Sequence, residues 1–358
     1  MMSFMRIDNG LYISGQIREE DIPAIKSSGI RSVICHRPDN EENGQPDFAE
    51  LAAKIRAAGI EHTYHQPIVS EQLNEEQSHI LNHILHEADF PVLMFCRTGT
   101  RSMLLWSMLQ AMQGISPAAL LKRAQQAGID LSCMSMKLKD IRRRYAPVVA
   151  IDVDAQRTFS PLCPNELPVA DGDKIVAELN KQAKLADFRV MTKDAHSASA
   201  IWAAQSPEQV LQPLNNKEKI NADVYWPRHA EVGSEGFELL PGLPAADKYD
   251  FLVYKGVEKD MHPYGACFHD LHDKISTGLI EWLNYIHAKT IIVGGLATDY
   301  CVKNTVLQLC RNGDRKVMVN LAACRGIADD TVAQAIAQMK DAGAIIVSDA
   351  DEIENLIL

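Results

Sequence analysis

Residues 290–313, TIIVGGLATDYCVKNTVLQLCRNG, decide how the second half of the chain folds. The first four residues suit a buried strand, and the two glycines that follow suit a turn. Apolar residues then recur at helical spacing up to a closing glycine. They are Val302, Val306, Leu309 and Cys310. The pattern predicts a strand, a tight turn and a helix whose first turn carries Cys301.

A cysteine at the first turn of a helix has the surroundings of a nucleophile. The helix dipole lowers the pKa of a thiol at that position, and unpaired backbone N–H groups nearby can bind an oxyanion. The alternative is a small buried core cysteine, which is the more common role of a single Cys. The case for catalysis therefore depends on what else the sequence places beside Cys301.

The composition is that of a globular protein. The chain has 358 residues, enough for two domains, and 46% of them are hydrophobic while 23% are charged. The net charge of -11 argues against a nucleic-acid or anionic-membrane partner. No apolar run reaches membrane-spanning length and the first residues lack the apolar core of a secretion signal, so we expect a cytoplasmic protein. The number of subunits is left open, a homo-oligomer included.

In the first half, short apolar runs alternate with helical patterns, which predicts an α/β layer structure. The strand-like runs are residues 10–15, 30–37, 60–68 and 91–96, and the helical patterns are 19–28, 46–58 and 74–88. A further helical segment, residues 116–145, closes a first domain over 1–145 and leaves 146–358 as the second.

The last of these runs leads into CRTGTRS, residues 96–102, before a helix expected to start near Met103. A cysteine that leaves a strand into a tight loop closed by arginine is typical of an anion-binding loop. Backbone N–H groups converge on the anion, and Arg101 can bind it through two hydrogen bonds. The same field favours the Cys96 thiolate. The loop consists of Cys96, Arg97, Thr98, Gly99, Thr100 and Arg101.

Two details of this loop favour sulfur transfer over phosphoester hydrolysis. Four residues separate Cys96 from Arg101, whereas the similar loop of protein tyrosine phosphatases has five. The shorter ring resembles that of rhodaneses, whose cysteine carries a persulfide. Phosphatases of this architecture use an Asp on a nearby loop as general acid, and between His62 and Asn74 the only carboxylate is Glu71.

Residues 4 to about 113 resemble the beta-lactamase-hydrolase-like family of dual-specificity-phosphatase-fold domains. The motifs that carry the resemblance are LYISGQI at 11–17, HRPDNEENGQP at 36–46 and CRTGTRS. The resemblance implies the fold and leaves the activity open. A regulatory module that senses an anion is the alternative to an enzyme.

In the second half, strand-like segments alternate with helices, which predicts a doubly wound, mainly parallel sheet covered by helices on both faces. The segments are residues 148–153, 188–192, 251–254, 290–293, 317–321 and 344–347. In such a sheet, ligands bind beyond the carboxyl ends of the strands.

The side chains just past those ends suit one reaction. They are Asp154, Asp194 with His196, Lys255 and Cys301. Asp154 beside Cys301 can take the thiol proton and later hand it to a departing amine, while Lys255 stabilises the thiolate. Backbone N–H groups of Ala297 and Cys301 would receive the carbonyl oxygen as an oxyanion. Such an arrangement performs acyl transfer through a thioester and, with water, amide hydrolysis.

A second group of residues suits a metal ion. Asp194 and His196 lie two residues apart, and His229 in YWPRH adds a third ligand from a loop that prolines constrain. Three protein ligands leave open positions for water or substrate. The alternative is that each histidine is structural.

Residues 147–358 resemble the nicotinamidases of the isochorismatase-like cysteine hydrolase superfamily. The matching stretches are VDAQRTF (153–159), KDAH (193–196), YWPRH (225–229), YKG (254–256), GGLATDYCVKNTV (294–306) and ACRGI (323–327). The resemblance implies a three-layer α/β/α domain that converts nicotinamide to nicotinate and ammonia within NAD salvage. It implies Asp154, Lys255 and Cys301 as the catalytic triad.

The resemblance also implies a cofactor and substrate contacts. Asp194, His196 and His229 would hold zinc, iron or manganese, which orients the pyridine nitrogen. Phe159 and Trp226 would flank the ring. The family has a cis peptide bond before the nucleophile, here between Leu296 and Ala297.

The chain departs from the nicotinamidase pattern at two places. Arg157 and Thr158 replace the Asn-Asp of the usual DxQNDF motif. The segment after His196 reads SASAIW without the further histidine that is often found there, so we expect the fourth protein ligand to be absent or replaced by water. Another small amide, or an isochorismate-like ether, is the alternative substrate, and isochorismatases lack the metal ligands.

Overall fold

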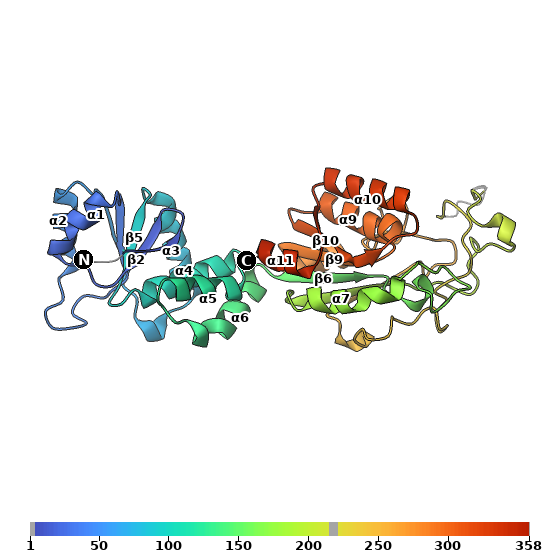
Figure 1. The fold of residues 1–358 in the computed structure, drawn as a ribbon, viewed down its shortest axis with the longest axis horizontal. Helices are drawn as coiled ribbons and strands as arrows, with labels where there is room; N and C mark the ends of the chain where they lie inside the picture. Colours follow the sequence, from blue (N-terminus) through green and yellow to red (C-terminus); the bar gives the residue numbers. More distant parts are fainter. Residues whose placement is uncertain (1–3, 215–220, 358) are drawn as a thin grey trace. The chain divides into compact units, whose positions relative to one another are not determined.

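The computed structural model describes residues 4–214 and 221–357, and it divides into two compact units between Tyr145 and Ala146 (Figure 1). Among the described residues, no helix has both the length and the apolar character needed to cross a bilayer.

Within its described residues, the first unit is built on a five-stranded sheet. Its strand order is β1-β2-β5-β3-β4, and every pair is parallel except β1 with β2. The strands are β1 (Met5–Asp8), β2 (Leu11–Ser14), β3 (Ser32–Cys35), β4 (His62–His65) and β5 (Val92–Phe95). The sequence patterns did not predict β1, because its four residues MRID include only two apolar side chains and form an edge strand.

Alternate residues of the central strands face opposite layers of helices, as period-two alternation requires. Val33, Leu93 and Phe95 pack with α1 (Ile22–Ser27) and α2 (Phe48–Ala57). Ile34 and Met94 pack with the helices of the other layer. These are α3 (Glu75–Glu87), α4 (Thr100–Met112), α5 (Pro117–Gln126) and α6 (Ser135–Tyr145). The helix expected near Met103 begins three residues earlier, because Gly99 adopts a left-handed conformation that starts α4 inside the loop.

The second unit, over its described residues, has a six-stranded, all-parallel sheet in the order β11-β10-β9-β6-β7-β8. The strands are β6 (Val148–Val153), β7 (Phe188–Asp194), β8 (Phe251–Lys255), β9 (Thr290–Leu296), β10 (Lys316–Arg325) and β11 (Ile345–Val347). The sheet confirms the predicted architecture. Several strands run further than predicted, so that Asp194 and Lys255 are the last residues of their strands rather than the first loop residues.

Helices cover both faces of this sheet (Figure 1). One face packs on α8 (Leu279–Tyr285), α9 (Lys303–Arg311) and α10 (Asp329–Asp341), and the other on α7 (Val176–Ala183) and α11 (Ala350–Ile357). The chain leaves β6 toward β7 on one side and returns to β9 on the other, so the strand order reverses between β6 and β9. Ligands of open α/β sheets bind beyond the carboxyl ends of the strands at such a reversal, which here is the edge that carries Asp154, Asp194, Lys255 and Cys301.

Candidate active site

Cys301 lies in a single π-helical turn between β9 and α9. The turn spans Thr298–Val302, and the N–H of Val302 donates to the carbonyl of Ala297, five residues back, at 3.1 Å. Cys301 therefore lies in the first turn of the helical segment, as predicted, and this turn is π-helical before the α-helix begins at Lys303, which the spacing of apolar residues did not reveal. The Leu296–Ala297 peptide bond is cis, as expected. Single π-helical turns are frequent at functional sites.

The structure brings Cys301, Asp154 and Lys255 together in a buried cluster. The Nζ of Lys255 lies 2.9 Å from Oδ2 of Asp154 and 3.6 Å from Sγ of Cys301. The same ammonium also donates to Oδ1 of Asp194. One oxygen of each aspartate and the sulfur of Cys301 all lie within 4.8 Å of one another. Asp154 and Lys255 have no exposed surface.

Thr192 fixes the orientation of Asp154 through a contact that no sequence pattern indicated. Its hydroxyl donates to Oδ1 of Asp154 at 2.6 Å, which leaves Oδ2 toward Lys255. The backbone of Asp154 has φ 44°, and its N–H donates to the carbonyl of Thr192 at 3.1 Å. A left-handed backbone at a residue other than glycine costs about 1 kcal/mol or more, so the surrounding strands hold the carboxylate in place.

The two carboxylates of the cluster have pKa values shifted in opposite directions. Burial raises the pKa of Asp154, with the charge of Asp194 adding to the effect. Burial also acts on Asp194, but the neighbouring Lys255 and His196 hold its pKa well below the usual range. Environments that separate two carboxyl groups in this way assign them different roles. Asp154 is the group that can exchange a proton, and Asp194 remains ionised.

Burial raises the pKa of the Cys301 thiol, and the lowering effect of Lys255 does not reverse this. Burial thus acts against the lowering of the thiol pKa expected at a helix end, while Lys255, expected to stabilise the thiolate, does act to lower that pKa. The pKa of Lys255 is raised: burial opposes its charge, but Asp154 and Asp194 beside it favour the charged form. The thiol needs a base within reach, and Asp154 is the group with the appropriate position and pKa.

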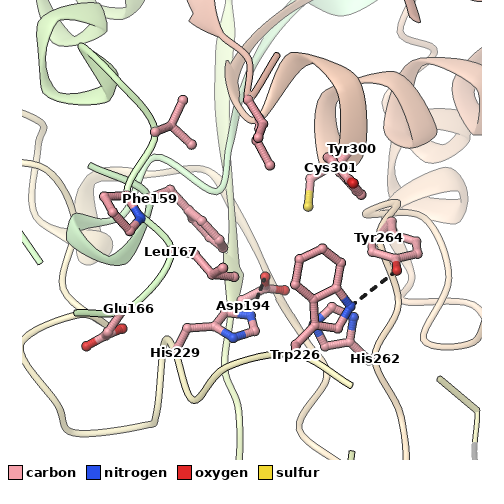
Figure 2. Close-up of a pocket in the computed structure, with 14 residues that line it drawn as sticks. Phe159, Glu166, Leu167, Asp194, Trp226, His229, His262, Tyr264, Tyr300 and Cys301 are labelled. Carbon is pink, nitrogen blue, oxygen red and sulfur yellow. Dashed lines mark hydrogen bonds and ion pairs between the residues drawn. The ribbon is translucent and has the colours of Figure 1, made fainter. Parts of the chain in front are cut away.

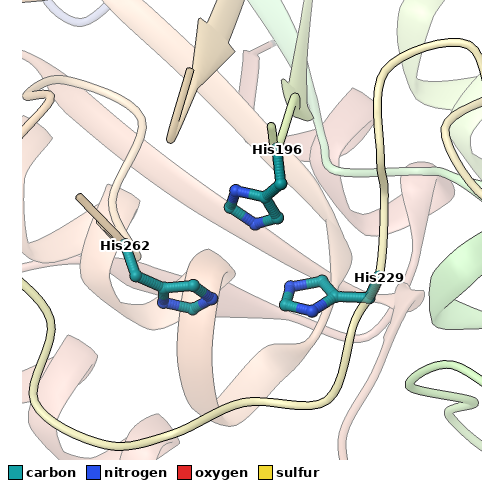
Figure 3. A group of neighbouring side chains, drawn as sticks. All are labelled: His196, His229 and His262. Atoms are coloured by element: carbon teal, nitrogen blue, oxygen red, sulfur yellow. The ribbon is translucent and has the colours of Figure 1, made fainter. Parts of the chain in front are cut away.

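Three buried histidines converge beside Asp194, as Figure 3 shows for His196, His229 and His262. A ring nitrogen of each lies within 4.8 Å of the other two. Nδ1 of His196 lies 3.0 Å from the Gly256 carbonyl, and Nδ1 of His229 lies 2.7 Å from the Pro227 carbonyl. A carbonyl can only accept, so each Nδ1 carries the proton and each Nε2 keeps a lone pair for a metal.

Asp194 completes this group. Its Oδ2 lies 3.7 Å from Nε2 of His196 and 3.9 Å from Nε2 of His229, spacings that one cation between them would satisfy. Gly256 makes room for the cluster, since a Cβ at that position would lie 2.4 Å from Cε1 of His196. The three residues predicted as metal ligands are thus neighbours in the structure.

His262 lies beside two of the predicted ligands, His196 and His229, and offers a further candidate nitrogen that the sequence patterns did not indicate. It comes from the loop after β8, far in sequence from the segment that follows His196. Both of its ring nitrogens are buried without a hydrogen-bond partner, and so is Nε2 of His196. Trp202, in the segment after His196, packs edge-on against His196 and His262, with ring centroids 4.6 and 4.5 Å away.

A cavity of about 160 Å³ opens between Cys301 and this cluster (Figure 2). Aromatic side chains line much of it: Phe159, Trp226, Tyr264 and Tyr300. The Nε1–H of Trp226 donates to the hydroxyl of Tyr264 at 3.3 Å, which fixes one wall. Phe159 and Trp226, predicted to flank the substrate, both line the cavity, as does Ala297 of the predicted oxyanion site.

The anion loop of the first unit forms around Cys96, which is buried. The N–H of Gly99 donates to its sulfur at 3.2 Å. Arg101 donates from its two terminal nitrogens to Oε1 and Oε2 of Glu41, at 2.7 and 2.8 Å. Arg101 and Arg37 hold the pKa of Glu41 below its usual value. Glu41 could not be predicted from local patterns, because nothing in its own segment shows that the loop after β3 folds back over Arg101.

Comparison with known families matches both units. A model of the phosphatase-like domain of beta-lactamase hydrolase-like proteins matches residues 3–113, and a model of the isochorismatase domain matches residues 149–351. The beta-lactamase hydrolase-like protein of Agrobacterium fabrum is 32% identical over 113 residues, which are 32% of this chain and 26% of that protein.

The second unit matches curated and solved nicotinamidases. The nicotinamidase of Acinetobacter baylyi is 31% identical over 180 residues, which cover 49% of this chain and 80% of that protein. The solved nicotinamidase/pyrazinamidase of Acinetobacter baumanii is 27% identical with a TM-score of 0.51, covering 57% of this chain and 97% of that one. The chain therefore belongs to the isochorismatase family, with a phosphatase-like domain of the beta-lactamase hydrolase-like type at its N-terminal side.

Proposed function

We propose that the second unit is a nicotinamidase, which hydrolyses nicotinamide to nicotinate and ammonia through a thioester on Cys301. The observation that carries the proposal is the buried cluster of Asp154, Lys255 and Cys301 at the end of an aromatic cavity. Relatives about 30% identical are nicotinamidases, which supports an amide as substrate.

In the first half of the reaction, Asp154 takes the proton of the Cys301 thiol and the sulfur attacks the amide carbon. The N–H groups of Ala297 and Cys301 receive the oxyanion. When the C–N bond breaks, Asp154 returns the proton to the leaving nitrogen, and ammonia departs. Lys255 keeps its charge between the sulfur and the carboxylate and balances the negative charge as it moves between them.

In the second half, Asp154 removes a proton from water, and the hydroxide attacks the thioester carbon. The C–S bond breaks, the sulfur regains the proton from Asp154, and the acid product gives its own proton to solvent and leaves as nicotinate. The cycle uses one water and no redox reagent. The raised pKa of Asp154 suits a group that must accept and return a proton twice per turnover.

Asp194, His196, His229 and His262 fit a divalent cation such as zinc, iron or manganese. The fit is supported by the buried ring nitrogens without partners and by the ionised Asp194 beside them. When bound, the cation would act as a Lewis acid that orients the pyridine nitrogen. Lys255 bridges Asp194 to Asp154, so it holds the ligand and the base at a fixed separation.

The cavity favours a small neutral aromatic amide over an isochorismate-like ether. Among its described lining residues there is no lysine or arginine, whereas carboxylates of an isochorismate-like substrate need cationic partners. A volume of about 160 Å³ and four aromatic side chains suit one flat ring. The test is ammonia release from nicotinamide, pyrazinamide and benzamide; benzamide lacks the ring nitrogen, so equal rates with it would contradict the proposed orientation.

We expect His262→Ala to weaken zinc binding by at least about tenfold, because changes even outside the ligand set cost that much in metal affinity. The measurement is competition for zinc with a coloured chelator, at fixed pH. The control is His272→Ala, which removes an exposed histidine ten residues further along the chain. Equal zinc affinities of the wild type and His262→Ala would remove His262 from the ligand set.

For the first unit we propose transfer of sulfane sulfur rather than phosphoester hydrolysis. The carboxylate bound to Arg101 is Glu41, whose lowered pKa keeps it ionised, so it is a poor proton donor to a leaving alkoxide. A leaving group that departs as an anion needs no such donor. In the proposed reaction the Cys96 thiolate takes the outer sulfur of thiosulfate, and sulfite leaves with the electron pair of the S–S bond. Cyanide then takes that sulfur as thiocyanate.

We expect Cys96→Ser to abolish thiocyanate formation from thiosulfate and cyanide. Cys133→Ser, at an exposed cysteine of the same unit, serves as the control and retains the rate. Rapid cleavage of p-nitrophenyl phosphate that depends on Cys96, without thiocyanate formation, would reverse the choice between the two reactions.

A further inference from the structure

Glu166 joins two segments of the second unit that are far apart in sequence. Its Oε2 accepts hydrogen bonds from the hydroxyl of Thr158 at 2.6 Å and from the N–H of Ala230 at 3.0 Å. Ala230 directly follows His229. Figure 2 shows Glu166 on the His229 side of the cavity, away from Cys301.

The peptide groups of Ala230 connect two of the histidines that face the cavity. Its N–H binds Glu166, while its carbonyl accepts from the N–H of His196 at 3.0 Å. Ala230 has φ 46°, a left-handed conformation that is unfavourable for a residue with a Cβ. The hydrogen bond from Ala230 to Glu166 therefore stabilises a backbone conformation that sets the separation of His196 and His229.

The packing around Glu166 leaves room for its carboxylate. A Cβ at Gly236 would lie 2.2 Å from Oε2 and 2.3 Å from Oε1 of Glu166. The carbonyl of Gly236 also accepts from the N–H of Thr158 at 3.1 Å, so this loop closes over the carboxylate. Only glycine at position 236 permits the approach.

Glu166 contacts Thr158, one of the residues at which the sequence departs from the nicotinamidase pattern. Thr158 stands where those enzymes usually carry Asp, which removes a carboxylate from this position. Here the carboxylate comes from Glu166, and the hydroxyl of Thr158 donates to it. The Thr158 hydroxyl and the Ala230 N–H thus donate to the same carboxylate oxygen, Oε2 of Glu166.

We propose that Glu166 is a positioning residue that holds His229 and His196 at the separation a divalent cation requires. The proposal rests on the metal site of the proposed function, and it does not depend on which amide is hydrolysed. A bond that orients a ligand loop changes metal affinity without contacting the metal, typically by about 10–100-fold.

The experiment measures cobalt(II) affinity by competition with a chelator and the visible spectrum of the saturated complex, using the full chain. We expect Glu166→Ala to bind cobalt about 10–100-fold more weakly and to change the d–d bands. Glu166→Gln keeps an acceptor oxygen for the Ala230 N–H, so it restores most of the affinity. Glu235→Ala is the matched control, since that glutamate is exposed in the same loop region and pairs with Arg157 instead.

The outcomes separate the claims. Equal cobalt affinity and an unchanged spectrum in Glu166→Ala, with or without a loss of apo-protein stability, would overturn the positioning role. If Glu166→Ala does not fold, the test uses Thr158→Val and Glu166→Gln instead. Wild-type cobalt affinity in Thr158→Val together with weak cobalt binding in Glu166→Gln would contradict the proposal that Oε2 of Glu166 acts by accepting from both Thr158 and Ala230. A wild-type chain that binds no cobalt would remove the metal site itself, whereas the ammonia assay of the wild type tests the substrate independently.

Discussion

The Cys301→Ala variant is expected to release ammonia from nicotinamide about 10⁴ to 10⁶ times more slowly than the wild type, the loss seen when a catalytic nucleophile is removed from a triad. The physical reason is that the sulfur forms the bond to carbon, and neither Asp154 nor Lys255 can replace it. The substitution removes one atom from a side chain that is 6% exposed, so the fold is retained. The measurement is steady-state ammonia release at saturating nicotinamide.

Two further observations make this result specific. Cys310→Ala is the matched control, because Cys310 lies in α9 and does not line the cavity. Wild-type enzyme quenched in acid during turnover should carry a nicotinoyl group on Cys301 in the mass spectrum. Undiminished turnover by Cys301→Ala would refute the assignment of the nucleophile.

The second large effect concerns stability. We expect Lys255→Met, studied in the presence of chelator, to lower the free energy of unfolding at pH 7 by about 3–5 kcal/mol, since removing one partner leaves buried charges uncompensated. Lys255 is bonded to both Asp154 and Asp194, and all three side chains are buried. Methionine fills a similar volume, so the decrease in the free energy of unfolding would come from the lost charge and not from a cavity.

The pH dependence of this loss has a defined sign. Without Lys255, two buried carboxylates face each other, so the pKa of at least one rises above its unfolded value. A carboxyl group with a raised folded pKa destabilises the fold as pH rises, and protonation relieves the cost as pH falls. The deficit of Lys255→Met should therefore shrink between pH 7 and pH 5 in urea unfolding.

The control is Lys248→Met, which removes an exposed lysine that lies 3.2 Å from Asp247. Exposed ion pairs contribute about 0–1 kcal/mol, so its unfolding free energy should barely change. A similar loss in both lysine variants would mean that Lys255 does not compensate the buried carboxylates.

Much of the second unit could be predicted because its strands are buried on both sides. Runs such as residues 148–151 and 291–293 are continuously apolar, so that strands could be predicted there and placed in order along the chain. The rule for parallel sheets then brought Asp154, Asp194, Lys255 and Cys301 to one edge, and the structure places them there. The burial of the thiol, which reverses the expected direction of its pKa, depends on packing that periodicity does not report.

The site residues that sequence patterns did not predict lie in loops. His262, Glu166 and Glu41 each reach their partners from segments without a repeating pattern, across separations that only the folded chain closes. His262 precedes a proline after β8, which was the one local signal that its loop is constrained. The edge strand β1 was not predicted for a different reason. Its two polar residues obscure the apolar pattern of a strand, and it is recognised as a strand only by its antiparallel pairing with β2.

The raised pKa of Cys301 also affects how readily this cysteine is oxidised or alkylated. Peroxide and alkylating reagents attack thiolates far faster than thiols, and desolvation keeps this sulfur protonated while the pocket holds no amide. In the proposed mechanism, the Cys301 sulfur therefore becomes a strong nucleophile only when an amide is bound and Asp154 takes the thiol proton. Damage by oxidants should fall first on sulfurs that lie nearer the solvent, such as Cys133.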